Sequence, residues 1–162
     1  MHNLRHLNRL TTGLSYLLQR DRVWGQPVFF TIETINTCNF RCVYCPQSDQ
    51  ENHFVNGRGV MSFEDFKHII ANLRSCFDVR IVSLHRDGEP LLNKRLEAYI
   101  EHLSQLGIYV TVSSNCSLLS EERGHRLIGA GLRMVSTDFC ADAAQYERLR
   151  VKGVWGETLA GI

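Results

Sequence analysis

Three closely spaced cysteines are the residues of this sequence best suited to chemistry. Cys38, Cys42 and Cys45 stand at Cx3Cx2C spacing, directly after an apolar run that is rich in β-branched residues. Three neighbouring thiolates can hold three irons of a [4Fe–4S] cube and leave the fourth iron without a protein ligand. An open iron site can bind a reactant, whereas a cluster with four thiolates normally only transfers electrons. The spacing therefore predicts an iron–sulfur centre at which chemistry takes place.

Two other uses of these cysteines compete with the cluster. A structural zinc site needs four ligands at tetrahedral geometry. No second Cys/His pair at zinc-knuckle spacing follows, and His53, in an expected loop, is the only nearby candidate. A disulfide framework fits poorly, because the 162 residues hold six cysteines and begin with no recognisable secretory leader. We therefore expect a reducing compartment, with the cytoplasm as the default.

The overall composition is that of an ordinary globular domain. Hydrophobic residues make up 44% of the sequence, charged residues make up 22%, and the formal net charge is +1. A chain of this kind can bury one core. Its near-zero charge leaves no basic footprint for nucleic acid, and no apolar run approaches the ~20 residues that a transmembrane helix needs. Neither nucleic-acid binding nor a transmembrane segment is indicated.

The first residues predict a helix with a leucine stripe. Over residues 4–18 the leucines recur at helical spacing, and Arg5 and Arg9 occupy other positions. Because this basic face is short, we expect the helix to pack on the domain. A membrane-surface or partner-binding helix is the alternative. The stripe consists of Leu4, Leu7, Leu10, Leu14, Leu17 and Leu18.

Beyond Pro27 the sequence alternates between strand and helix patterns. Strands are expected at residues 28–35, 79–84, 108–113 and 132–137, and helices at residues 62–74, 93–106, 120–128 and 143–150. Four βα repeats indicate an α/β fold with a parallel sheet and right-handed crossovers. A barrel and a doubly wound sheet both fit this pattern, and both gather ligands at the carboxyl ends of the strands.

Polar residues stand at these strand ends. On the third expected strand, Ser113 and Asn115 share one face by alternation, opposite the apolar Val110 and Val112, so we expect them to point into a site. Two further residues stay open between roles. Glu33 is either a site base or a paired charge, and His85 is either a donor to a substrate or a structural histidine.

Several of these residues resemble motifs of the radical S-adenosylmethionine (radical SAM) superfamily. The cysteine triad has that family's spacing and its aromatic residue before the last cysteine, here Tyr44. Gly88-Glu89-Pro90 corresponds to the tail of the family's GGEP motif and follows the second expected strand. The resemblance runs from about residue 28 to the end of the sequence. It implies a partial (βα) radical SAM barrel of about four parallel strands, with helices on the outer face.

Within the superfamily, the sequence is most similar to the branch whose members carry a C-terminal SPASM or twitch domain. The phrases that carry this similarity are Ile32-Glu33-Thr34, Gly59-Val60-Met61-Ser62, and Leu149-Arg150 followed by Gly153. The family core has more βα units than the four expected here. We therefore expect residues 1–26 to form an N-terminal amphipathic helical extension, and residues 27–162 a C-terminally truncated radical SAM core.

The resemblance also implies a cofactor set. The three cysteines would bind the [4Fe–4S] cluster and take part in catalysis directly. Gly88, Glu89 and Pro90 would hold the methionyl ammonium of SAM, since a carboxylate suits a cation and glycine allows close backbone approach. One electron, from a donor of flavodoxin or ferredoxin type, would cleave SAM to methionine and a 5′-deoxyadenosyl radical. This radical would abstract hydrogen from an unknown peptide or small-molecule substrate.

Four further residues would complete the cofactor site by the same resemblance. Ser113 and Asn115 would line the ribose and carboxylate side of SAM, and Tyr44 would lie near the adenine. Asp138 matches a Ser-x-Asp pattern at the end of the fourth strand. Serine and asparagine also cap helices and make turns, which is the structural alternative for these positions.

The sequence departs from the family pattern at three places. Asp87 replaces the first glycine of GGEP, Cys116 replaces the glycine after Asn115, and Phe139-Cys140 replaces the glycine after Asp138. These departures motivate a second hypothesis, a non-catalytic iron–sulfur or zinc binding module on the same scaffold. Cys116 and Cys140 are either reactive thiols or small buried residues, and buried cysteines are the commoner case. The remaining thiol, Cys76, is expected in the core.

Overall fold

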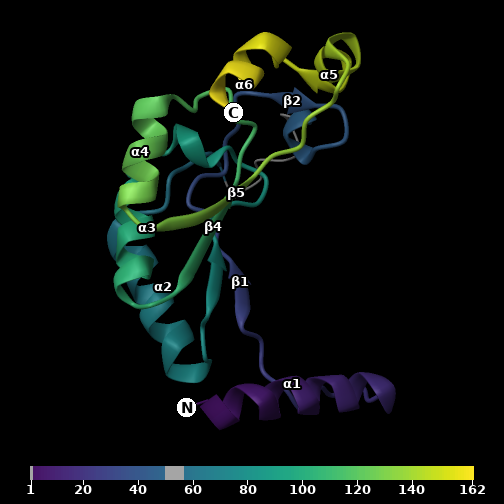
Figure 1. The fold of residues 1–162 in the computed structure, drawn as a ribbon, viewed down its shortest axis with the longest axis vertical. Helices are drawn as coiled ribbons and strands as arrows, with labels where there is room; N and C mark the ends of the chain where they lie inside the picture. The colour runs from purple at the N-terminus through teal and green to yellow at the C-terminus, as the bar shows by residue number, and fades with distance from the viewer. Residues whose placement is uncertain (1, 50–56) are drawn as a thin grey trace.

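A four-stranded parallel sheet forms the centre of the molecule. The structure, a computed structural model, describes residues 2–49 and 57–162, and His53 lies outside them. The strands β1 (Phe29–Thr31), β3 (Ile81–Ser83), β4 (Tyr109–Ser113) and β5 (Leu132–Ser136) are adjacent in that order. Helices α2 (Phe63–Cys76), α3 (Leu96–Gln105) and α4 (Glu121–Gly129) cover one face of the sheet, and no helix of the described residues covers the other face (Figure 1). The predicted α/β architecture with helices on one outer face is confirmed.

The helices begin where their capping residues predict. Ser62 precedes α2, and its hydroxyl oxygen accepts a hydrogen bond from the Asp65 N–H. The Ser62 hydroxyl in turn donates to the Asp65 carboxylate at 2.6 Å, a bond between side chains in place of the backbone bond of the expected capping box. Ser120 accepts from the Arg123 N–H in the same way and opens α4. Both starting points agree with the sequence analysis.

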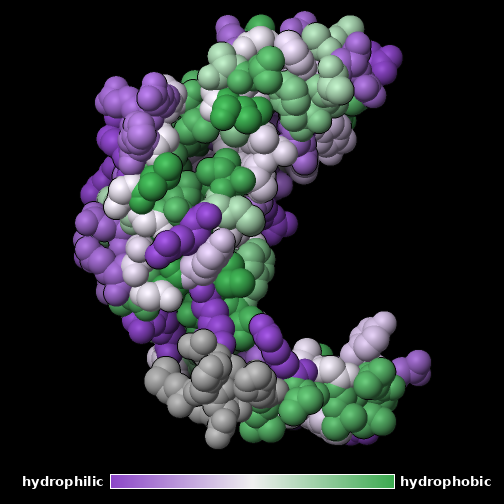
Figure 2. All heavy atoms as spheres, in the orientation of Figure 1, coloured by the Kyte–Doolittle hydropathy of each residue, from purple (hydrophilic) through white to green (hydrophobic). Residues whose placement is uncertain are grey.

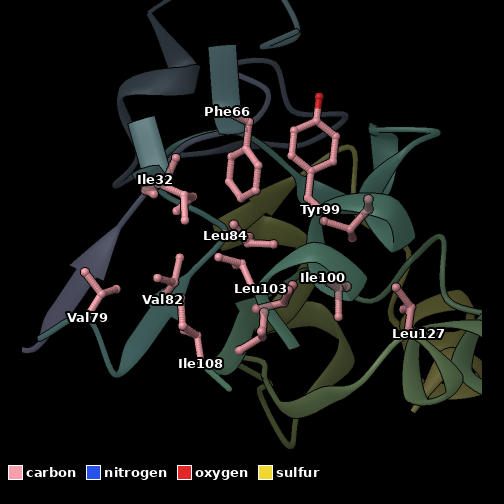
Figure 3. Close-up of a cluster of buried hydrophobic side chains, with 14 of the residues drawn as sticks. Ile32, Phe66, Val79, Val82, Leu84, Tyr99, Ile100, Leu103, Ile108 and Leu127 are labelled. Carbon is pink, nitrogen blue, oxygen red and sulfur yellow. The ribbon is translucent and has the colours of Figure 1, made fainter. Parts of the chain in front are cut away.

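The core lies between the sheet and its three helices. Val82, Val110 and Val112 project from the strands toward α2 and α3, and their side chains are almost completely buried. On the helix side, the rings of Phe66 and Tyr99 meet edge to face, with centroids 4.7 Å apart (Figure 3). The predicted alternation on β4 is thus confirmed, and it turns the polar side chains of this strand away from the helices.

Several elements are shorter than expected, and for two of them the structure shows the reason. The predicted strand over residues 28–35 ends at Thr31, since the following residues leave the sheet and pair with the segment before α2. There, the Met61 N–H donates to the Thr34 carbonyl, and Ile35 bridges Val60. The helix expected from residue 93 begins only at Leu96, because residues 90–92 form the short 3-10 helix η2 (Pro90–Leu92).

The cysteine loop and the C-terminal part contain elements that were not predicted. The two-residue strands β2 (Arg41–Cys42) and β6 (Arg150–Val151) pair in antiparallel fashion, so the cysteine loop is bound to the end of α5 (Ala143–Leu149). Helix α6 (Trp155–Gly161) follows. A second 3-10 helix, η1 (Pro46–Ser48), comes directly after the cysteine triad. The expectation of a buried Cys76 is wrong, because this last residue of α2 is exposed.

The first helix, α1 (His2–Leu17), lies at the opposite end of the sheet from β2 and α6 (Figure 1). The expectation that its leucines pack on the domain is wrong for the described side chains, since Leu7, Leu10, Leu14 and Leu17 are all exposed. No helix among the described residues is long and apolar enough to cross a membrane.

Candidate functional site

The three cysteines of the Cx3Cx2C motif lie in the loop after β1, at the carboxyl end of the sheet. Cys38, Cys42 and Cys45 line a single cavity of about 170 Å³. Burial raises the pKa of Cys38 to about 11 and also raises the pKa of Cys45. Thiols of this kind give up their protons where a cation takes the proton's place, as a metal centre does. The site is therefore chemically suited to metal binding.

Backbone contacts shape the cysteine loop from two sides. The Phe40 N–H donates to Cys38 Sγ at 3.4 Å, and the Cys45 N–H donates to the Cys42 carbonyl at 3.0 Å. On the other side, the pairing of β2 with β6 places Cys42 opposite Arg150. The middle cysteine is thus positioned by the C-terminal segment and not by the central sheet.

Arg150 brings a buried cation to the thiols. Its Nη1 lies 3.9 Å from Cys42 Sγ, and its Nη2 lies 3.2 Å from a carboxylate oxygen of Asp138. Its Cζ is 5.6 Å from the ring centroid of Tyr44 and 5.7 Å from that of Tyr146. A guanidinium held in this way stabilises thiolates and carboxylates nearby. Sequence reasoning assigned Arg150 no role, although the residue belongs to one of the phrases shared with the SPASM branch.

Glu89 braces the ends of β3 and β4. Its carboxylate is buried and accepts hydrogen bonds from the Leu91 N–H at 2.9 Å, the Ser114 hydroxyl at 2.8 Å and the Asn115 N–H at 2.8 Å. Burial raises the pKa of Glu89, and these three bonds oppose that effect. Because both carboxylate oxygens already accept bonds, Glu89 acts first on the loops of the protein itself.

Glu33, which follows β1, likewise accepts hydrogen bonds from the loop after β3. Its Oε1 accepts from the Asp87 N–H at 2.8 Å and from the Gly88 N–H at 3.0 Å. The role left open in the sequence analysis is therefore neither a paired charge nor a free base, but a brace for the neighbouring loop. Gly88 packs so closely that an added Cβ would lie 1.9 Å from the Ile35 carbonyl oxygen. Asp87 fits at the first glycine position of the motif because its φ is not positive.

Ser113 and Asn115 both line the cavity, and Ser114 between them lines it as well. The Asn115 side-chain amide donates to Asn39 Oδ1 at 2.9 Å and lies 3.8 Å from Cys38 Sγ. The next residue, Cys116, has a φ of 58°, in the left-handed region that favours glycine. This backbone requirement explains why the family pattern has glycine where the present sequence has Cys116.

His85 is held as one defined tautomer. Its Nδ1 lies 2.7 Å from Ser83 Oγ and accepts the Ser113 N–H at 3.2 Å. Since a backbone N–H only donates, Nδ1 is unprotonated and the neutral ring carries its proton on Nε2. Burial lowers the pKa of His85, which keeps the ring neutral at pH 7. No hydrogen bond joins Nε2 to the described residues, so one ring nitrogen is structural and the other remains a donor at the cavity.

Nine of the ten predicted site residues line the cavity, and Pro90 is the exception. Pro90 is buried and opens η2 beside the site. Tyr44 and Asp138 line the cavity from its exposed rim. The sequence analysis left the roles of two further thiols undecided. Cys116 is buried, and Cys140 packs with Cys42 and its aromatic neighbours. Neither of these two thiols lines the cavity.

The thiols do not converge on one point. Within residues 2–49 and 57–162, no three His, Cys, Asp or Glu side chains are arranged to hold a single metal ion. A [4Fe–4S] cube binds each thiolate through a different iron, and the three thiols that it needs line one cavity here. Three thiols with a cation at 3.9 Å fit such a cluster by the chemistry of the donor set.

Comparison with known families decides which group of proteins this site belongs to. The model of the radical SAM superfamily matches residues 32–162. The chain belongs to the radical SAM superfamily. Enzymes of this superfamily bind a [4Fe–4S] cluster and SAM, which are the expected cofactors. Relatives of this radical SAM chain include members of the SPASM/twitch branch, as the sequence phrases indicated.

Curated relatives of this radical SAM chain are enzymes of different kinds. It is 28% identical over 137 residues to a GTP 3′,8-cyclase of Gloeobacter violaceus, which covers 83% of this chain and 42% of the relative. It is 26% identical over 117 residues to a PqqA peptide cyclase of Rhodopseudomonas palustris, which covers 72% of this chain and 29% of the relative. The chain thus spans less than half the length of these relatives.

Two solved structures have the same fold as this chain. BtrN in complex with AdoMet and 2-DOIA has a TM-score of 0.63 and 21% identity, and covers 85% of this chain and 56% of that protein. Streptococcus suis SuiB bound to the precursor peptide SuiA has a TM-score of 0.62 and 18% identity, and covers 85% of this chain and 30% of SuiB. These two likenesses confirm the fold.

Proposed function

We propose that this chain is the N-terminal part of a radical SAM enzyme that binds a [4Fe–4S] cluster through Cys38, Cys42 and Cys45. The observation that carries the proposal is that these thiols share one cavity with the braced Glu89 loop and with buried Arg150. When bound, the cluster and SAM supply a 5′-deoxyadenosyl radical that abstracts hydrogen from a substrate. A donor of flavodoxin or ferredoxin type provides the electron, and the cytoplasm suits both the thiols and this donor.

The residues around the cavity provide charges that complement SAM. Arg150 is a cation that favours the methionyl carboxylate, and Asp138 at the rim orients the guanidinium. The methionyl ammonium needs acceptors. The Glu89 carboxylate is already bonded to three donors, so we infer that it attracts the ammonium by its negative charge and not by a direct hydrogen bond. We assign the direct contact with the ammonium to the closely packed backbone at Gly88.

Two side chains supply neutral hydrogen-bonding groups to the same cavity. The Ser113 side chain points into the cavity while its backbone N–H holds His85. The Nε2–H of His85 provides a donor that does not change charge near neutral pH, because burial keeps the ring unprotonated at Nδ1. Neutral donors suit the ribose hydroxyls of the cofactor or an uncharged acceptor on a substrate. Asn115 positions its amide between the cysteine loop and β4.

The substrate class rests on the named relatives alone. PqqA peptide cyclase and SuiB with its precursor peptide SuiA act on or bind peptides, whereas GTP 3′,8-cyclase and BtrN with 2-DOIA are associated with small molecules. We infer a peptide or small-molecule substrate. The choice between them belongs to the whole protein.

Anaerobic reconstitution tests the proposal directly. The purified chain should take up about four irons and four sulfides and turn brown, as expected for one cube. With dithionite and SAM it should release 5′-deoxyadenosine. Cys42→Ser should abolish both results, whereas Cys76→Ser, at an exposed thiol far from the cavity, should change neither. A colourless protein with a single tetrahedral zinc would refute the proposal.

The alternative, a non-catalytic iron–sulfur or zinc module, rested on the departures at Asp87, Cys116 and Cys140. The backbone accommodates Asp87, and neither Cys116, at a left-handed φ of 58°, nor Cys140 lines the cavity. No observation in the described residues therefore favours it. A chain that binds the cube but releases no 5′-deoxyadenosine would support this alternative.

A further inference from the structure

The surface of helix α1 presents an uncovered apolar face. Its described leucines, together with the adjacent Leu18, are between 47% and 75% exposed. Figure 2 shows hydrophobic side chains gathered along this helix. Contiguous apolar patches of this kind on soluble proteins mark surfaces that contact another molecule. The face consists of Leu7, Leu10, Leu14, Leu17 and Leu18.

The contacts of α1 with the rest of the chain use its polar side. Asn8 donates to the Gln26 carbonyl at 3.1 Å and accepts from the Gln26 N–H at 2.7 Å. Ser15 is buried and accepts from the Trp24 N–H at 2.9 Å. Asn8 and Ser15 are seven residues apart and lie on one stripe of the helix. The fold therefore ties down the polar stripe and leaves Leu10, Leu14 and Leu17 exposed, while Leu7 lines a cavity between α1 and the end of α2.

The charge of this segment has one dominant sign. Residues 1–26 contain four arginines and a single acidic residue, Asp21, whereas the whole chain has 18 basic and 17 acidic residues. The basic excess of the protein thus lies in this segment. The guanidinium of Arg20 stands over the ring of Trp24 at 5.3 Å, and this ring is 48% exposed. Leucine and tryptophan with arginine in place of acidic residues are the composition of helices that lie in the membrane interface.

Charge complementarity selects the occupant of the face. Two copies of this segment would bring arginines against arginines, which disfavours self-association. An anionic lipid surface offers both an apolar layer for the leucines and negative headgroups for the arginines. We propose that α1 together with residues 18–24 is an anchor that holds this protein on the surface of a bilayer containing anionic lipids.

The position of the anchor leaves the cysteine site free. Helix α1 lies at the end of the sheet opposite to β2, which carries Cys42 (Figure 1). The anchor is thus independent of the proposed enzyme activity, and binding to lipid can be measured without the cluster.

Co-sedimentation of the full chain with vesicles tests the anchor. The protein should pellet with vesicles of phosphatidylcholine and phosphatidylserine, and poorly with phosphatidylcholine alone. Arg9→Gln should weaken binding to the anionic vesicles about fivefold, the equivalent of ~1 kcal/mol for one basic residue at the surface. The same change should leave the weak binding to neutral vesicles as it is.

Two matched variants separate the leucine face from general stickiness. Leu17→Ser and Tyr16→Ser each remove a large exposed side chain from α1, but only Leu17 lies on the leucine face. Leu17→Ser should weaken binding about tenfold, and Tyr16→Ser much less. Equal effects of the two variants, equal binding to both vesicle types, or no binding at all would each overturn the proposal. Sedimentation as a dimer that Leu17→Ser disperses, without vesicle binding, would instead identify an interface between two copies.

Discussion

Glu89→Gln is the change that tests most directly how the site is built. The buried carboxylate accepts from two backbone N–H groups, of Leu91 and Asn115, through different oxygens. A glutamine side chain has the same shape but offers only one oxygen. Whichever way the amide is turned, its NH2 faces one of these two N–H donors. The substitution therefore leaves a buried backbone donor without an acceptor.

The size of the effect follows from the terms that oppose each other at this position. A hydrogen bond to a charged group contributes about 1.5–3 kcal/mol, and an unsatisfied buried donor costs about 1–3 kcal/mol. Removal of a buried charge offsets part of this loss, since burial disfavours the ionised form of Glu89. We expect a net loss of about 1–3 kcal/mol in the free energy of unfolding at pH 7, measured by urea denaturation of the full chain.

The pH dependence of this difference has a definite sign. Burial raises the pKa of Glu89 above its ordinary value of 4.5. A group with a raised folded-state pKa contributes stability that is present below the unfolded pKa and is lost as the pH rises through the folded pKa. The gap between wild type and Glu89→Gln should therefore widen as the pH falls from neutral toward 4.5.

A matched control is available on α3. Glu101 is exposed, and its carboxylate accepts only a long bond of 3.4 Å from Gln105. Glu101→Gln should change stability by less than about 0.5 kcal/mol. If Glu89→Gln is as harmless as Glu101→Gln, the reasoning that the carboxylate braces the loops after β3 and β4 is refuted.

Three further changes probe other parts of the site. Gly88→Ala places a Cβ 1.9 Å from the Ile35 carbonyl oxygen and should destabilise the chain by about 1–3 kcal/mol in thermal unfolding. Gly59→Ala is the control, because a Cβ at Gly59 would meet no atom within 4 Å. Equal melting temperatures of the two variants would contradict the close approach at Gly88. Burial lowers the pKa of His85, so its contribution to stability is present above the ordinary value of 6.5 and is lost as the pH falls through the folded pKa. Wild type should accordingly lose stability below pH 6.5 relative to His85→Gln, and parallel pH profiles in urea denaturation would show that the ring is not held neutral. Arg150→Gln removes a cation 3.9 Å from Cys42 Sγ and should lower the reduction potential of the reconstituted cluster by about 60 mV, as measured by an EPR-monitored redox titration. The control Arg148→Gln, at an exposed position, should leave the potential unchanged. An unchanged potential in Arg150→Gln would rule out the electrostatic role of Arg150.

The two faces of β4 could be predicted from local patterns, because the information lies within a few residues. Alternation alone assigned Ser113 and Asn115 to the cavity and Val110 and Val112 to the core, and the structure agrees. The cysteine spacing predicted the centre of the site for the same reason. Local patterns are sufficient where one strand and the loop that follows it supply all of the relevant residues.

The role of Arg150 could not be predicted in this way. In the sequence it ends the helix expected over residues 143–150 and resembles any basic residue in a last helical turn. Only the pairing of β2 with β6 brings it to Cys42, across a separation of 108 residues in the chain. Two-residue strands carry too little periodicity to be recognised before the fold is known.

The prediction that the leucine stripe of α1 packs on the domain failed for a different reason. Periodicity shows which face of a helix is apolar, but not which molecule covers that face. Here the side that meets the domain is decided by a few polar bonds, such as those of Asn8 with Gln26. These bonds involve backbone groups whose positions a sequence pattern does not reveal.

The site is built from two parts, and each part is held by its own set of contacts. Two carboxylates connect the rim of the sheet, since Glu33 after β1 accepts from the amides of the loop after β3, and Glu89 in that loop accepts from Asn115 after β4. These bonds join groups of the protein itself and need no cofactor. The middle cysteine depends instead on the short β2–β6 ladder and on Arg150. The cavity joins the two parts, because Cys38 lies against Asn115 on the braced rim while Cys42 lies against the C-terminal segment.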